Sequence, residues 1–163
     1  MSAALDGLEL RVVADKTELC RLMLANWGSQ RMMIDLHVYD VAEIDALGLY
    51  EPDGRTAALA SWTMRGGNAY LCALHSLKPG EGVAIRMLDA VVTTARAAGA
   101  RKLKAMLTND NMPGLTFYQR QGFRLSGLYI EAIDAYRSVV PGIIRTGYRD
   151  IPVRDAIELE IAL

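Results

Sequence analysis

The sequence predicts an α/β domain with a mixed, mostly antiparallel sheet and helices on both faces. Several strand patterns joined by short turns fill the middle of the chain, which favours antiparallel pairing. Two amphipathic helical stretches then alternate with strands in the second half, which favours helices packed on a sheet. At 163 residues the chain fits one domain spanning 1–163, and a domain of this size can bury a core without a metal or a disulfide.

The first half of the chain is expected to form a strand, a helix and an antiparallel meander. Apolar residues recur at helical spacing in the helix, which Asp15 or Thr17 can cap and Gly28 can end. The strands alternate in apolar character, and Pro52-Asp53-Gly54 provides turn chemistry between two of them. The expected elements, in order, are a strand at Leu8–Val13, a helix from Thr17 to about Trp27, a strand over part of Arg31–Val38, and strands at Ala46–Tyr50, Thr56–Met64 and Ala69–His75.

The second half is expected to alternate helices and strands. An apolar stripe at helical spacing marks the first helix, and Gly99 is a suitable C-terminal cap. Pro113 suits the first turn of the next helix, which Gly122 ends. The expected elements, in order, are a helix from Gly82 to about Ala98, a strand at Lys102–Thr108, the helix from Pro113, a strand at Arg124–Ile133, a helical turn at Ala135–Val139, a loop over Val140–Val153, and a terminal strand at Ile157–Ala162 with one buried face.

Composition excludes several classes of function. A net charge of −1 provides no broad attraction for nucleic acid or an anionic membrane. No apolar run approaches the length of a membrane span, and the first residues lack the basic and apolar regions of a signal peptide. Cys20 and Cys72 have no metal-ligand spacing, and neither lies in a motif for a nucleophilic thiol. We therefore expect a cytoplasmic protein that binds neither nucleic acid, membrane nor metal.

A glycine-bearing turn, Lys78-Pro79-Gly80-Glu81-Gly82, leads directly into the second predicted helix. Backbone N–H groups at a helix N-terminus can bind an anion such as a pyrophosphate, and glycines let it approach closely. A Walker A loop would need Lys-Ser or Lys-Thr here, and a dinucleotide fingerprint would need a glycine where Ile85 stands. Such a turn can also be a plain connection between a strand and a helix.

The second motif is Thr108-Asn-Asp-Asn-Met-Pro-Gly-Leu-Thr-Phe-Tyr-Gln-Arg-Gln-Gly-Phe123. Together with the glycine turn, it resembles the acyl-coenzyme A site of the GNAT superfamily of N-acetyltransferases. Pro79 and Gly114 depart from the residues usual in that pattern. The ends of the chain, including Trp27-Gly28-Ser29, are similar to a bacterial subgroup whose acceptors are mostly undefined. The resemblance implies a GNAT-like fold, acetyl-CoA as cofactor, and cofactor contacts from Leu77, Gly80, Glu81, Gly82, Val83, Ala84, Ile85, Asn109, Asn111 and Tyr118.

The resemblance also implies catalytic roles. Tyr118 would lie near the thioester sulfur, where a phenol can return a proton to the leaving thiolate. The strand before the glycine turn has no carboxylate, and His75 is its one side chain that titrates near neutrality. We therefore expect His75 to act as the base or in a proton relay. The alternatives are that His75 and Tyr118 are structural, and that Asn109, Asp110 and Asn111 only cap the helix.

The predicted activity is direct transfer of an acetyl group from acetyl-CoA to a primary amine of a small molecule or peptide. Acceptor selection is expected from two segments, Trp27 to Asp45 and Val140 to Asp155, the second of which includes Tyr148. Acidic residues of the first segment could recognise a cationic amine, whereas Arg145, Arg149 and Arg154 of the second could bind a carboxylate. The alternative function is a non-catalytic module that binds acyl-CoA or a partner. A homodimer is possible, and the apolar terminal strand could form its interface.

Overall fold

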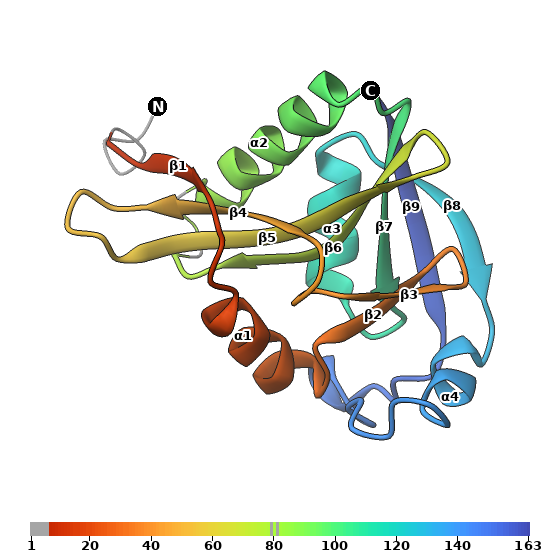
Figure 1. The fold of residues 1–163 in the computed structure, drawn as a ribbon. Helices are drawn as coiled ribbons and strands as arrows, with labels where there is room; N and C mark the ends of the chain where they lie inside the picture. The colour runs from red at the N-terminus through yellow and green to blue at the C-terminus, as the bar shows by residue number, and fades with distance from the viewer. Residues whose placement is uncertain (1–6, 79, 81) are drawn as a thin grey trace.

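The computed structural model describes residues 7–78, 80 and 82–163. Its main sheet has seven strands in the order β1-β4-β5-β6-β7-β9-β8, and only β6 and β7 are paired in parallel (Figure 1). The strands are β1 (Glu9–Val12), β4 (Asp45–Tyr50), β5 (Thr56–Arg65), β6 (Asn68–Ser76), β7 (Lys102–Thr108), β8 (Arg124–Tyr129) and β9 (Ala156–Ala162). The predicted mixed, mostly antiparallel sheet is therefore confirmed.

Helices cover both faces of this sheet, as predicted. They are α1 (Thr17–Trp27), α2 (Val83–Ala97), α3 (Met112–Arg120) and α4 (Ala132–Tyr136), with a 3₁₀ turn at Tyr148–Asp150. Apolar residues of α2 and α3 pack in one core cluster, against β-strand residues such as Ala60 and Leu103. Residues of α1 and α4 pack in a second cluster, against residues such as Leu59 and Tyr70 on the opposite side of the same strands. Alternation along each strand thus supplies both cores.

The segment predicted as one strand over part of Arg31–Val38 is a hairpin. Strands β2 (Arg31–Ile34) and β3 (His37–Asp40) pair with each other outside the main sheet. Asp35 and Leu36 form the turn between them with φ of 53° and 57°. Two consecutive residues with positive φ are the geometry of a tight hairpin turn, but neither is the glycine that usually marks one. This is why the alternation was visible in the sequence and the turn was not.

Two predictions near the C-terminus need correction. The strand predicted to reach Ile133 ends at Tyr129, and α4 begins at Ala132 instead of Ala135. The terminal strand is an interior strand, because β9 pairs with β7 on one side and β8 on the other. Its second face is also buried at one end, where the Glu158 carboxylate accepts hydrogen bonds from the Asp35 N–H and the Tyr129 hydroxyl. Neither edge of β9 is therefore free to pair with a strand of a second copy, and the homodimer stays a prediction.

Candidate active site

Strands β6 and β7 separate partway along their length. Their parallel pairing runs from Ala69 to Leu71 on β6 and from Leu103 to Ala105 on β7, although both strands continue beyond it. The separation begins where the pairing of β5 with β6 shifts between Ser61 and Trp62, so that Cys72 is an extra residue on β6. A bulge bends its strand and increases the local twist. The diverging strands leave a cavity of about 670 Å³ between them.

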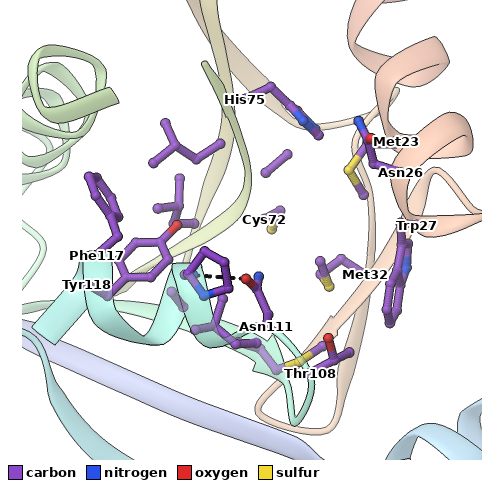
Figure 2. A pocket seen from close by; sticks show the side chains of 18 of the residues that line it. Met23, Asn26, Trp27, Met32, Cys72, His75, Thr108, Asn111, Phe117 and Tyr118 are labelled. Atoms are coloured by element: carbon purple, nitrogen blue, oxygen red, sulfur yellow. Dashed lines mark hydrogen bonds between the residues drawn. The ribbon is translucent and has the colours of Figure 1, made fainter. Parts of the chain in front are cut away.

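Residues from both faces of the sheet line the cavity (Figure 2). On one side it is lined by Met23, Asn26 and Trp27 of α1 together with Met32 of β2. On the other side it is lined by residues of α3, including Phe117 and Tyr118, and by Ala84 of α2. A ligand that enters from the α2–α3 side and one that enters from the α1 side can therefore meet in the gap of the sheet.

The backbone of β6 presents hydrogen-bonding groups to this gap. The Leu77 N–H points to β5, where it donates to the Ala57 carbonyl at 2.9 Å. Since N–H groups alternate in direction along a strand, those of Leu74 and Ser76 point away from β5 and toward the gap. Backbone polar groups in a partly buried cavity require partners. A chain-like ligand with amide groups can supply them, and a carbonyl oxygen can accept from these donors.

The predicted glycine turn lies beside the cavity. Gly82 is the N-cap of α2 with φ of 73°, and its carbonyl accepts from the Arg86 N–H at 3.1 Å. The N–H groups of Val83, Ala84 and Ile85 come before this first helical bond and so point out of the helix end. Gly80 has φ of 82°, and no atom of the described residues beyond its chain neighbours lies within 4 Å of the place where its Cβ would stand. The N-terminus of α2 thus has the geometry that the anion-binding prediction needs.

The remaining residues of that prediction contribute differently. Val83 is fully buried in the core, so only its backbone can reach a ligand, whereas the side chains of Leu77 and Ile85 are about two-fifths exposed. Glu81 and Pro79, on either side of Gly80, lie outside the described residues. Ala84 lines the cavity directly.

Tyr118 lies at the cavity wall with its hydroxyl directed inward (Figure 2). Its ring packs edge-on against Phe117 and Phe123, with centroid separations of 5.2 and 5.1 Å. The side chain is only 7% exposed, and burial raises the pKa of the Tyr118 phenol. The phenol therefore keeps its proton at neutral pH and is fixed as a donor facing the gap.

The asparagines of the second motif have structural contacts. Asn111 is the N-cap of α3, and its Oδ1 accepts from the Gly114 N–H at 2.9 Å. It nevertheless lines the cavity. The Asn109 amide donates to the Pro152 carbonyl, and its oxygen accepts from the N–H groups of Arg154 and Asp155. Asn109 thus fastens the loop before β9 to the end of β7, and Asn111, not Asn109, is the residue that caps α3.

His75 lies in the cavity wall near the α1 side. Its Nε2 is buried and has no hydrogen-bond partner among the described residues. Burial lowers the pKa of the imidazole, so the neutral form, which can accept a proton, predominates at neutral pH. The structure thus brings His75, Ala84, Asn111 and Tyr118 around one cavity, and their roles there stay predictions.

Sequence reasoning expected the acceptor side to include Trp27 and the loop that contains Tyr148, but it missed Asp110 as a residue of the cavity. Asp110, Gly147 and Tyr148 line it together with Trp27. Asp110 is buried, and its Oδ2 accepts from the Tyr148 N–H at 3.0 Å. Asp110 was visible in the second motif, but its contact joins two positions 38 residues apart, the turn after β7 and the 3₁₀ turn that begins at Tyr148. The arginines proposed as carboxylate ligands do not line this cavity, and Arg154 pairs with Asp134 and Glu131 instead.

Other chemistry finds no support among the described residues. They contain no group of three or more His, Cys, Asp or Glu side chains placed to hold a metal. In the same part of the chain, no helix is long and apolar enough to cross a membrane. Cys72 lines the cavity, but burial raises its pKa to about 12. Its thiolate is therefore scarce at neutral pH, which disfavours a nucleophilic role.

Comparison with solved structures identifies the fold. A GNAT family acetyltransferase from Elizabethkingia anophelis, solved with acetyl-CoA bound, superposes with a TM-score of 0.78 at 15% identity, covering 97% of this chain and 99% of that one. An IAA acetyltransferase from Bacillus cereus ATCC 14579 gives 0.77 at 17% identity, covering 96% and 100%. The chain has the GNAT acetyltransferase fold. A Bacillus subtilis acetyltransferase in complex with CoA shares this fold, with a TM-score of 0.75 at 14% identity over 96% and 99% of the two chains.

Two curated proteins are similar to the chain in sequence, and both are uncharacterized. The uncharacterized protein YxbD of Bacillus subtilis (strain 168) is 28% identical over 134 residues, which cover 82% of this chain and 84% of YxbD. The uncharacterized protein YdhI of the same strain is 24% identical over 153 residues, covering 91% and 96%. No protein-family model matches the chain. The solved structures thus confirm the GNAT-like fold that the sequence predicted.

Proposed function

We propose that this protein is an acetyl-CoA-dependent N-acetyltransferase that moves an acetyl group directly to a primary amine. The observation that carries the proposal is the cavity in the gap between β6 and β7, with Tyr118 at one wall and His75 at another. Two solved structures with the same fold contain CoA or acetyl-CoA. We propose the same cofactor for this protein.

The residues present fit such a cofactor. The free N–H groups at the start of α2 suit an anionic pyrophosphate, because the helix end adds a partial positive charge. The gap-facing N–H groups of Leu74 and Ser76 suit an amide-bearing arm laid along β6. Acetyl-CoA, when bound, supplies an acetyl group activated as a thioester.

Three different groups of the protein would then stabilise the thioester carbonyl, protonate the leaving sulfur and accept the proton of the amine. An N–H of β6 in the gap can donate to the thioester carbonyl and stabilise the charge that develops on its oxygen. The buried Tyr118 phenol can give a proton to the departing sulfur. The neutral imidazole of His75 can take the proton that the amine loses, directly or through a water. Since the Cys72 thiol is held protonated, transfer in one ternary complex is favoured over an acyl-enzyme.

One observation favours the alternative of a non-catalytic binding module. Strand β6, from Asn68 to Ser76, has no carboxylate that could serve as the base. If His75 does not accept the proton, the same cavity could bind acyl-CoA without turning it over. Activity measurements separate the two functions directly.

The test is thermal unfolding with and without acetyl-CoA, for the wild type and a Gly82→Glu variant. A ligand at about 100 times its Kd stabilises the folded state by about 2.7 kcal/mol, which corresponds to roughly 5–10 °C in Tm for a chain of this size. Glu at position 82 places a negative charge where the pyrophosphate would bind, so we expect this stabilisation to be lost. Gly99→Glu is the matched control, because Gly99 also has positive φ, at the other end of the same helix, with open space around it.

Stabilisation that persists in Gly99→Glu and disappears in Gly82→Glu supports the cofactor site. A screen of primary amines by thiol release then tests transfer. Absence of stabilisation at millimolar acetyl-CoA would contradict the proposed function.

A further inference from the structure

The wall of the cavity on the α1 side is apolar and uncharged. It is formed by α1, β2 and the loop after α4, and the side chains that these segments contribute are Met23, Asn26, Trp27, Met32, Ile144 and Tyr148. Four of them are apolar, and the other two have polar groups without a charge. In Figure 2, Trp27 and Met32 lie across the cavity from Tyr118. A ligand body on this side therefore meets mostly carbon and sulfur.

Charged groups near this wall are not available to a ligand. Asp110 is 6% exposed; its Oδ2 accepts from the Tyr148 N–H and its Oδ1 is buried, so almost none of this carboxylate can be reached. Asp35 and Asp40, from the segment expected to select the acceptor, do not line the cavity and accept hydrogen bonds elsewhere. The described lining residues include no Lys or Arg. Burial lowers the pKa of His75, so the imidazole is neutral at neutral pH.

Hydrogen bonds hold the apolar wall in place. The Trp27 indole N–H donates to the Arg31 carbonyl at 2.9 Å, which fixes the ring between α1 and β2. The buried Arg137 guanidinium donates to the Ile144 and Val153 carbonyls, which fastens the loop that contains Ile144. Because these polar groups are already paired, water beside the wall gains few hydrogen bonds, and its replacement by an apolar group is favourable.

An uncharged wall affects the two ends of an acceptor differently. The reacting amine must be neutral to attack, and removal from water disfavours the charged form of an amine. The wall therefore helps to supply the nucleophile in its reactive form. A second charged group on the acceptor would lose its hydration without gaining a partner, which is strongly unfavourable.

We propose that the acceptor is a primary amine on an uncharged, apolar body, an alkylamine or an arylalkylamine, and that Trp27, Met32 and Ile144 select it. This inference rests on the proposed acetyl transfer, which assigns the α2–α3 side of the cavity to the cofactor and leaves the α1 side to the acceptor. A diamine or an amino acid would bring a second charge to a wall that has no accessible group of opposite charge.

The experiment compares acceptors of similar length that differ in charge at the far end. Hexylamine, 1,5-diaminopentane and 5-aminopentanoate end in a methyl, an ammonium and a carboxylate group. We expect kcat/KM for hexylamine to exceed the other two values by about 10-fold or more, because only the methyl group is buried without loss of hydration. From propylamine to hexylamine, kcat/KM should rise by about threefold to fourfold for each buried methylene. The comparison of 2-phenylethylamine with phenylalanine, which adds a carboxylate, repeats the test on an aromatic body.

A carboxylate introduced into the wall should shift the preference toward the diamine. Met32→Glu places one on β2 at the cavity, so the ratio of kcat/KM for 1,5-diaminopentane to that for hexylamine should rise by about 10-fold or more. Met33→Glu is the matched control and should retain the wild-type ratio. Met33 is the next residue of the same strand, is also partly buried, and is not among the residues that line the cavity.

A second variant serves if Met32→Glu does not fold, which thermal unfolding shows. Met32→Ala removes apolar contact without adding charge, so it should lower kcat/KM for hexylamine more than that for propylamine. Equal kcat/KM for hexylamine and 1,5-diaminopentane in the wild type, or a higher value for either charged acceptor, would overturn the proposal. The same ratio in folded Met32→Glu and Met33→Glu would also overturn it.

A binding measurement separates this inference from the proposed function. Calorimetric titration of N-hexylacetamide and N-acetyl-1,5-diaminopentane, the acetylated forms of two acceptors, into the protein with CoA present requires no turnover. Tighter binding of N-hexylacetamide that Met32→Glu weakens supports the apolar site even if no amine is acetylated, in which case the proposed function alone fails. Equal affinity for the two compounds, or binding of neither, refutes the apolar site whether or not acetyl transfer occurs.

Discussion

The close approach of Gly28 to Gly142 predicts that a side chain at position 28 would destabilise the fold. Gly28 ends α1 with φ of 85°. A Cβ at this position would stand 1.9 Å from the Gly142 carbonyl oxygen, and one at Gly142 would stand 2.5 Å from the Gly28 oxygen. The two backbones therefore touch. The neighbouring Ile144 N–H donates to the Trp27 carbonyl at 3.2 Å, so the loop is fastened to the end of the helix.

Gly28→Ala should destabilise the fold more than its backbone conformation alone requires. The left-handed conformation costs about 1–2 kcal/mol with a Cβ. The loop must also move away, which weakens the Ile144 bond, worth about 1 kcal/mol, and loosens the packing of the buried Ile143. The first two terms sum to about 2–3 kcal/mol, and the loosened packing of Ile143 adds about 1 kcal/mol. The total of about 3–4 kcal/mol corresponds to roughly 10 °C in Tm for a chain of this length.

The matched control is Gly54→Ala. Gly54 has φ of 87°, and in the part of the chain that the structure describes nothing lies within 4 Å of its Cβ position. This variant carries the conformational cost without the clash, so its Tm should fall by only about 3–5 °C. Thermal unfolding followed by circular dichroism measures both. Equal losses in the two variants would refute the reasoning, because they would show that the loop does not press on the end of α1.

The remaining predictions concern the cavity. Tyr118→Phe should lower kcat by about 100-fold, as expected for loss of a general acid, while thermal stabilisation by CoA persists; an unchanged kcat would exclude the phenol as the donor. His75→Gln should lower kcat/KM and remove its acid limb, and a pH–rate profile like that of the wild type would show that another group is the base. Burial lowers the pKa of His75 in the folded state, so below its unfolded pKa of about 6.5 the unfolded chain binds the proton more readily. Wild-type stability should therefore fall as the pH drops below about 6.5, with a smaller slope in His75→Gln when unfolding by urea is measured at each pH.

Elements governed by local signals could be predicted from the sequence. The bounds of α1 and β7 match the predicted helix at Thr17–Trp27 and strand at Lys102–Thr108. Both are specified by periodicity and by neighbouring residues such as Gly28, whose φ is positive. The glycine turn at Gly82 and the aromatic pair at Phe117 and Tyr118 were also visible, because short-range spacing fixes their places on a helix end and a helix face.

Tertiary contacts decided the rest. The turn at Asp35 lacks a glycine, and the short bond from its N–H to the Glu158 carboxylate joins residues 123 positions apart. The separation of β6 from β7 depends on the bulge opposite Ser61, and no local feature of the sequence indicates this bulge. Asp110 becomes a buried carboxylate in the cavity wall only when the loop at Gly147 folds over it. Local propensity acts over a few residues, whereas burial and an unpaired polar atom are properties of segments brought together by folding.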